Sequence, residues 1–141
     1  MTTPEIFATI LFCDETRQEN TGKQILIGEY AATCNFAKIP AIMNSLTCVV
    51  ILHWFNLDHD QIVHVQVDGP VAGQQLKFDI SINVEQPMTG DDMGYHFGSF
   101  SSFQVPIEST GSFVEAKVIH EESLLTRRRL IFMETPATKE N

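Results

Sequence analysis

The sequence is short of basic residues. Its 141 residues include nine Lys and Arg against 18 Asp and Glu, which gives a formal net charge of −9 and an isoelectric point near 4.8. Binding to nucleic acid depends on Lys and Arg contacts with phosphate, and anionic membrane surfaces recruit the same side chains. We therefore expect neither nucleic acid nor a membrane as partner. The acidic balance favours cations or a basic protein.

Long apolar runs and paired cysteines are also missing. No apolar run approaches the roughly 20 residues of a membrane-spanning helix. The N-terminal stretch MTTPEIFATILFC has no basic region and carries Glu5 before its apolar run, so we expect no secretory signal and a cytoplasmic protein. Cys13, Cys34 and Cys48 are an odd number without CxxC spacing, and we expect reduced, partly buried thiols.

Helical periodicity is absent, and apolar residues alternate instead with a period of two, most cleanly in 75–85. We predict strands at residues 5–13, 24–31, 45–55, 61–68, 74–85, 97–105, 112–119 and 124–133. Turn-forming Gly, Pro, Asn and Asp separate most of them. Evenly spaced strands without intervening helices predict an all-β fold, an antiparallel β-sandwich of about eight strands. We expect one domain over 1–134 and a flexible tail at 135–141.

Three segments give more detailed expectations about packing. Strands 45–55 and 74–85 carry the densest inward apolar series, so we expect them to be the most buried. The apolar segment Cys34–Met43 is expected to close the core, or to form a protein-binding patch if it is exposed. Arg127-Arg128-Arg129 should send its first and last side chains to one face and Arg128 to the other. We interpret this run as a charged edge strand that pairs with nearby Glu, in preference to an anion site.

Catalytic motifs are missing from the sequence. It has no Gly-x-Ser-x-Gly, no phosphate-binding loop and no His-Glu-x-x-His. The serines of 98–102 follow the period of a strand, and nothing places a base beside them. We therefore predict a protein that is not an enzyme and uses no cofactor, with an uncharacterised enzyme as the weakest alternative.

Two histidines could lie side by side. If 45–55 and 61–68 form a hairpin, then one register makes His53 and His64 cross-strand neighbours. Two imidazoles could begin a metal site, but Asp58 and His59 at the hairpin tip are too distant to supply a third ligand. The sequence leaves the adjacency of the two histidines open, and we predict no metal site there.

Residues 11–30 carry the most distinctive pattern, LFCDETRQENTGKQILIGEY. Its order of apolar-Cys-Asp-x-x-Arg, then Gly-Lys, then Leu-Ile-Gly-x-Tyr resembles a family of small bacterial proteins of unknown function. Ile39-Pro40-Ala41 and the C-terminal strand pair fit the same family. The resemblance implies a single all-β domain and no established activity. Two features depart from the family pattern, namely the arginine run at 127–129 and the long connection 86–96.

The polar segment Asp14–Lys23 lies inside that pattern. We interpret it as the connection of a hairpin formed by 5–13 and 24–31. Asp14 is then expected to accept hydrogen bonds from backbone amides of its own loop, and Arg17 to pair with a carboxylate or a carbonyl. The alternative is that Asp14 and Arg17 together grip a polar ligand.

Acidic residues concentrate in alternate connections. If each strand crosses the sandwich once, these connections emerge at one end. The predicted binding surface consists of Asp14, Arg17, Asp58, Asp60, Asp91, Asp92, Glu121 and Glu122. We predict a non-enzymatic protein-interaction or binding module, with a protein as the partner. A Ca²⁺-dependent binding domain is the alternative, because carboxylates from several loops are the hard oxygen ligands that Ca²⁺ prefers. The sequence does not define the oligomeric state.

Overall fold

The computed structural model describes residues 5–83 and 93–135. This part of the chain is all-β and contains no helix, as the sequence predicts. Its ten strands are β1 (Glu5–Cys13), β2 (Glu15–Gln18), β3 (Gln24–Ile27), β4 (Thr33–Phe36), β5 (Ala41–Phe55), β6 (Gln61–Asp68), β7 (Gln75–Ile82), β8 (Met93–Ile107), β9 (Phe113–His120) and β10 (Ser123–Glu134). The proposed single-domain boundary stays a prediction, and most of the expected tail lies outside the described residues.

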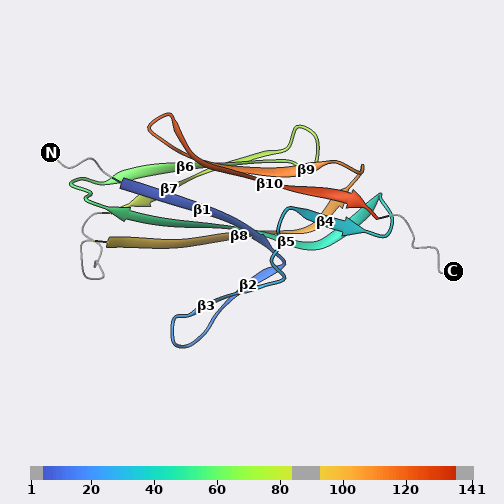
Figure 1. The fold of residues 1–141 in the computed structure, drawn as a ribbon, viewed down its shortest axis with the longest axis horizontal. Helices are drawn as coiled ribbons and strands as arrows, with labels where there is room; N and C mark the ends of the chain where they lie inside the picture. The colour runs from blue at the N-terminus through green and yellow to red at the C-terminus, as the bar shows by residue number, and fades with distance from the viewer. Residues whose placement is uncertain (1–4, 84–92, 136–141) are drawn as a thin grey trace.

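Two sheets stack on one another to form a sandwich (Figure 1). One sheet has three antiparallel strands in the order β1-β5-β8, and the other has five in the order β4-β10-β9-β6-β7. Only the β4–β10 pair among these is parallel. A single hydrophobic core lies between the sheets, with Phe12, Leu52, Trp54, Val65, Val118 and Phe132 among its fully buried members.

The burial of the strands follows their position in the sheets. β5 is central in its sheet and is buried along most of its length, as expected. The expectation that 74–85 would be equally buried is wrong, because β7 is an edge strand and most of its side chains are exposed. Alternation reveals which face of a strand is inward, but it does not reveal how many neighbours the strand has.

The predicted hairpin of 45–55 with 61–68 is also wrong. β5 and β6 belong to different sheets, and residues 56–60 carry the chain from one layer to the other. His53 therefore lies beside Tyr95, with 5.1 Å between ring centroids, whereas His64 contacts Asp79 at 2.6 Å. Packed sheets are only about 10 Å apart, so five residues suffice for the crossing. The two histidines are not neighbours.

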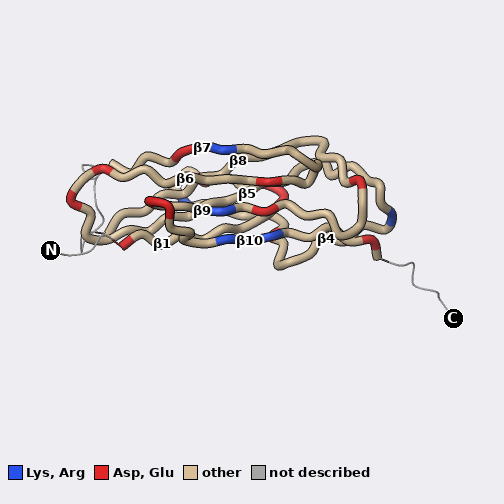
Figure 2. The backbone as a smooth tube through the Cα atoms, turned by 90° about the horizontal axis from the view of Figure 1, so that it is seen from above, with Lys and Arg blue, Asp and Glu red and all other residues tan. Residues whose placement is uncertain are grey.

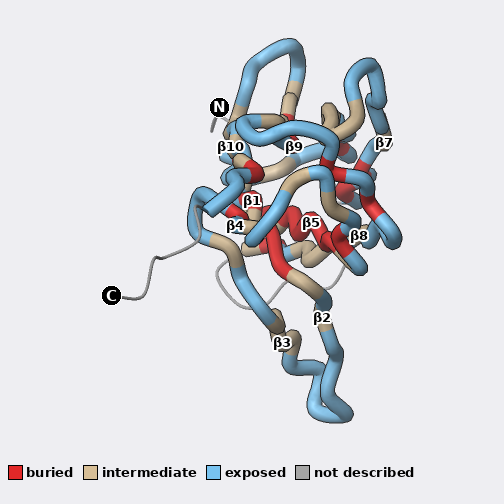
Figure 3. Tube along the Cα trace, turned by 90° about the vertical axis from the view of Figure 1, so that its right-hand side faces the viewer, coloured by how far each residue is buried: buried red, intermediate tan, exposed pale blue. Residues whose placement is uncertain are grey.

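A third, two-stranded sheet projects from the sandwich. Residues 5–13 pair with β5 rather than with 24–31, and the predicted first hairpin is reduced to an isolated bridge between Phe12 and Tyr30. The polar segment instead forms its own hairpin, in which β2 pairs with β3. We call Glu15–Ile27 the arm. It extends away from the outer side of the three-stranded sheet (Figures 1 and 3).

The segment Cys34–Met43 adds a strand to the sandwich rather than acting only as a connection. Cys34 is buried in β4, which pairs with the end of β10. β10 therefore lies between β4 and β9, and the prediction that 124–133 is an edge strand is wrong. The two-face prediction for the arginine run is correct, since Arg129 pairs with Glu115 while Arg128 reaches toward β1.

Candidate functional site

The structure divides the predicted acidic surface. Asp58 and Asp60 lie in the β5–β6 connection, and Glu121 and Glu122 form the β9–β10 turn. The Gln61 side chain links these two connections through hydrogen bonds of 2.7 Å to His59 and 2.8 Å to His120. These four acidic residues therefore share one end of the sandwich. Asp91 and Asp92 lie outside the described residues.

Asp14 and Arg17 lie elsewhere, and the prediction that they join the other acidic loops is wrong. Since β1 and β5 are antiparallel, the chain leaves β1 in the direction opposite to the one in which it leaves β5. The sequence-based expectation assumed that every strand crosses the sandwich once, so that alternate connections share one end. It fails because residues 24–31 form an arm strand and a turn instead of crossing the sandwich. The predicted surface is thus not one contiguous site.

Asp14 fastens the base of the arm. Its backbone N–H donates to the carbonyls of Ile27 at 2.9 Å and Gly28 at 3.2 Å, and its own carbonyl accepts from Ser45 and Thr47. The Asp14 carboxylate accepts a hydrogen bond from the Tyr30 hydroxyl, whereas no described backbone amide donates to it. The prediction that backbone amides of its own loop donate to the Asp14 carboxylate is therefore wrong for the described residues, because the donor is the side chain of Tyr30. Burial, supported by this bond, raises the pKa of Tyr30.

Two other residues of the 11–30 pattern have local explanations. Gly28 has a φ of +69°, and a Cβ there would lie 2.1 Å from Oδ2 of Asp14, so this position requires glycine. Arg17 pairs with Glu15 at 3.1 Å, as predicted, and both side chains are exposed. The pattern thus builds the arm and its attachment. Asp14, Glu15, Ile27 and Tyr30 also line a cavity of about 560 Å³, together with residues of β4 and the first part of β5.

The acidic end shows no metal centre among the residues that the structure describes. Asp58 contacts the Nδ1 atom of His59 at 2.5 Å, and Glu121 lies 3.9 Å from His120. No group of three or more His, Cys, Asp or Glu side chains is placed to hold an ion within 5–83 and 93–135. The geometry of the described residues therefore gives the Ca²⁺ alternative no support.

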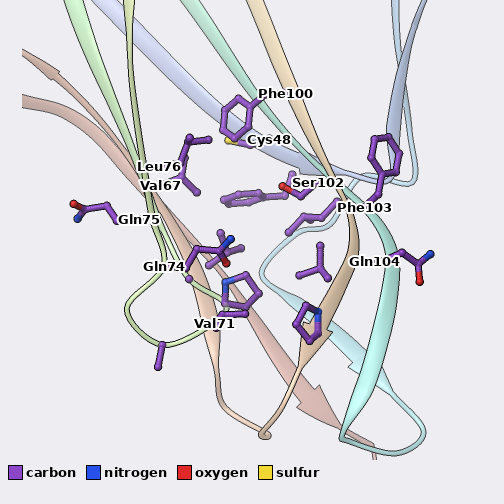
Figure 4. Close-up of a pocket in the computed structure, with 18 of the residues that line it drawn as sticks. Cys48, Val67, Val71, Gln74, Gln75, Leu76, Phe100, Ser102, Phe103 and Gln104 are labelled. Carbon is purple, nitrogen blue, oxygen red and sulfur yellow. The ribbon is translucent and has the colours of Figure 1, made fainter.

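A cleft of about 770 Å³ opens on one long side of the sandwich (Figure 4). It lies between the edge strands of the two sheets. One wall is the second half of β8, at residues 100–106, and the other is the β6–β7 connection with the start of β7, at residues 69–76. Phe12, Leu46 and Cys48 from β1 and β5 form its floor. This volume lies within the roughly 300–1,000 Å³ of typical ligand sites.

The lining of the cleft is uncharged. Its walls combine apolar side chains such as Val67, Leu76 and Phe100 with a few polar groups, which are Ser102, Gln74, Gln75 and Gln104. Burial raises the pKa of the Cys48 thiol to about 12, so this thiol is neutral at physiological pH. An apolar occupant that brings a few hydrogen-bonding groups matches such a lining.

Free strand edges border the cleft. β8 ends one sheet and β7 ends the other, and no described strand pairs with either outer edge. The two edges meet where the rings of Phe78 and Phe100 make an edge-to-face contact, with 4.8 Å between centroids. Beyond this contact the seam is open. Gln104, on the cleft wall, has a φ of 53°, which is an uncommon conformation for a residue other than glycine.

Sequence reasoning missed this cleft, because strand patterns do not show which strands become edges. One signal was present. Pro106 interrupts a strand-like run, and a proline within a strand favours an edge position, since it cannot donate a ladder hydrogen bond. The predicted strand at 97–105 lies within β8, whose bounds extend it at both ends.

Comparison with known proteins gives no family assignment. No family model matches the sequence, and the search of curated proteins finds no match. The resemblance of residues 11–30 to small bacterial proteins therefore stays a prediction. No helix in the described structure is long and apolar enough to cross a membrane.

Proposed function

We propose that this protein is a non-enzymatic binding module that captures an extended apolar segment of a partner protein. The segment would add to the free edge of β8 and insert side chains into the inter-sheet cleft. One observation carries this proposal: an uncharged cleft of about 770 Å³ opens directly beside an unpaired strand edge.

The edge and the cleft supply complementary parts of such recognition. An edge strand presents unpaired N–H and C=O groups, which an extended peptide satisfies without regard to its sequence. Side chains of the added strand alternate, so every second one enters the cleft. Because the cleft lining contains no charged residue, we expect these inserted side chains to be uncharged and mainly apolar.

The charge of the chain constrains the rest of the partner. With a net charge of −9, the protein attracts basic segments and repels acidic ones. We therefore expect Lys or Arg at the solvent-facing positions of the bound strand. The three free, buried cysteines are consistent with a reducing compartment, and we place this function in the cytoplasm.

A peptide library displayed on phage tests the proposal, with the full chain as bait. Selected peptides should alternate apolar and basic residues and should protect backbone amides of 99–105 from hydrogen exchange. Leu76→Lys places a charge at the cleft and should weaken binding at least about tenfold. Leu124→Lys is the matched control, because Leu124 on β10 is 52% exposed and Leu76 is 47% exposed.

Three outcomes would contradict the proposal. The first is an absence of alternating peptides among the selected sequences. The second is equal binding by the Leu76→Lys and Leu124→Lys proteins. The third is occupation of the cleft by the neutral apolar dye Nile red without any peptide that competes with it, which would indicate a small-molecule site instead of strand addition.

A further inference from the structure

The connection between β6 and β7 borders two cavities. We define the flap as residues 69–74, which form this connection. Every residue of the flap lines the cleft of about 770 Å³, and every one also lines a second cavity of about 480 Å³. The β8–β9 connection and the start of β9 form the other wall of this second cavity, which we call the rear cavity. The flap is thus a wall that the two cavities share.

Few bonds hold the flap to the rest of the chain. The Gly69 N–H donates to the Gln74 carbonyl and the Gln74 N–H to the Val71 carbonyl, each at 3.0 Å, so both bonds are internal. Within the described residues, no hydrogen bond joins 70–73 to β8 or to the β8–β9 connection. The flap, drawn tan between β6 and β7 in Figure 2, contains no Asp, Glu, Lys or Arg that could form an ion pair. A segment with so few bonds to its surroundings moves at a low cost in free energy.

The two ends of the flap are fixed, in contrast to its tip. The Asp68 carboxylate at the end of β6 accepts a hydrogen bond of 2.7 Å from Gln75 at the start of β7. A Cβ at Gly69 would lie 2.3 Å from the Phe113 carbonyl oxygen, so β9 packs closely on the first flap residue. At the tip, Gly73 has a φ of +80°, and no atom lies within 4 Å of the position of a Cβ. Fixed ends and an open tip are the features of a hinged loop.

We propose that the flap is a hinged wall that sets how large a side chain the cleft accepts. Movement toward the β8–β9 connection transfers space from the rear cavity to the cleft, and movement toward β8 narrows the cleft. Neither movement breaks a described hydrogen bond to the rest of the chain or separates an ion pair, so the two positions differ little in free energy. The identity of the occupant rests on the proposed function, whereas the movement itself does not.

A movable wall has a consequence for selectivity. The flap faces β8 across the cleft, so side chains that a partner strand inserts there meet the flap, including Val71 and Gln74 (Figure 4). A small inserted side chain leaves space that the flap fills by moving inward, which removes water from the apolar lining. A large aromatic one requires the flap to move back into the rear cavity. The wild-type protein should therefore accept peptides with either Ala or Phe at the inserted positions.

Filling the rear cavity tests the proposal, because it removes the space that the flap needs. Ser109 lines this cavity, is exposed, and offers only its backbone carbonyl to described hydrogen bonds. Ser109→Trp should lower the affinity for Phe-inserting peptides at least about tenfold relative to Ala-inserting peptides. Glu108→Trp, in the same lining, is a second variant with the same expected result. Ser123→Trp is the matched control, because Ser123 is exposed at the start of β10 and lines neither cavity.

NMR relaxation dispersion of the free protein tests the movement without any peptide. Backbone amides within 69–74 should exchange on the microsecond-to-millisecond timescale in the wild type, and Ser109→Trp, but not Ser123→Trp, should suppress this exchange. Circular dichroism confirms that each variant is folded. Flat dispersion profiles in the wild type, or equal Phe-to-Ala affinity ratios in Ser109→Trp and Ser123→Trp, would overturn the hinged wall. Exchange within 69–74 without binding of any peptide would contradict the proposed function alone, and the movement of the flap would stand.

Discussion

The two long sides of the sandwich are closed in different ways. On the β1–β10 side, the Arg128 guanidinium donates hydrogen bonds to the carbonyls of Ile10, Tyr30 and Ala31, at 2.8, 3.2 and 2.6 Å. On the β7–β8 side, an aromatic contact closes part of the seam and an apolar cleft occupies the rest. One side is thus sealed by directional polar bonds, and the other keeps strand edges and apolar surface available.

The position of Arg128 explains why the first side needs a cation. Arg128 pairs with Ala116, which is fully buried, so its side chain begins on the inner face of β10. From there it extends across to β1, whose outer edge has no partner strand in the described structure. A guanidinium offers several donors in one plane and can satisfy carbonyls that no strand reaches. Within the described residues, no arginine is hydrogen-bonded to β8.

Removing this cation should produce the largest loss of stability. Arg128→Ala leaves the three carbonyls without their charged donor and should lower the free energy of unfolding by about 2–4 kcal/mol. Urea denaturation followed by circular dichroism measures the change. Arg127→Ala is the matched control, because Arg127 is exposed and makes no hydrogen bond or ion pair with any described residue; it should change stability by less than about 0.5 kcal/mol. Equal losses in the two variants would remove the contrast between the sides.

Alkaline pH tests whether water is excluded from Cys48 at the floor of the cleft on the β7–β8 side. Burial raises the pKa of Cys48 to about 12, whereas an unfolded thiol titrates near about 8.5. The folded protein therefore retains a proton that the unfolded chain releases, so this contribution to stability is complete below pH 8.5 and is lost as pH rises. The expected loss from Cys48 is about 2 kcal/mol at pH 10.

Thermal unfolding of the wild type and of Cys48→Ala between pH 7 and pH 10 measures this loss. The variant should show a shallower decline, although Cys13, Cys34 and Tyr30 also have raised pKa values and act in the same direction. Identical pH profiles for the two proteins would mean that water reaches Cys48 through the cleft.

The aromatic contact should matter less than the arginine. Phe78→Ala removes the edge-to-face contact with Phe100 and part of the packing on the core, and should destabilise by about 1–2 kcal/mol. Phe103→Ala serves as the comparison, because Phe103 borders the same cleft but is 72% exposed. Its change should stay below about 0.5 kcal/mol. Similar losses would show that Phe103 helps to hold the seam closed.

The sequence was informative wherever alternation decides the structure. The period of two predicted the absence of helix, the buried central strand at 45–55 and the two faces of the arginine run. It could not predict sheet membership, because a strand that enters the other layer has the same pattern as one that stays. For this reason β5 and β6 were expected to be a hairpin, and β7 was expected to be buried.

The candidate site was hidden from the sequence for a related reason. The predicted acidic surface depended on each strand crossing the sandwich once, so that alternate connections lie at one end. The arm is an additional hairpin that does not cross the sandwich, so this assumption does not hold. The cleft depends on which edges stay unpaired, and that depends on contacts between residues far apart in the chain, such as the β4–β10 pair. Single-sequence patterns do not encode those contacts.

The smallest predicted effect concerns the backbone at the open side. Gln104 has a φ of 53° at the point where the β5–β8 ladder passes from the Met43–Val105 pair to the Ser45–Phe103 pair. A left-handed conformation strains a residue with a Cβ, so Gln104→Gly should stabilise the protein by about 0.5 kcal/mol after the entropic cost of glycine is included. Asn56→Gly is the control. Asn56 has a φ of 58°, but asparagine tolerates this conformation and little should change.

Urea denaturation of the two glycine variants at equal m-value separates the possible roles of Gln104. If Gln104→Gly alone is stabilised and also binds peptide more weakly, the strained backbone at Gln104 is maintained for recognition at the cleft. A loss of stability in that variant would show instead that the Gln104 side chain holds the wall of the cleft in place. The open side would then be braced by a polar side chain, as the other side is by Arg128, and the contrast between the two sides would be one of degree.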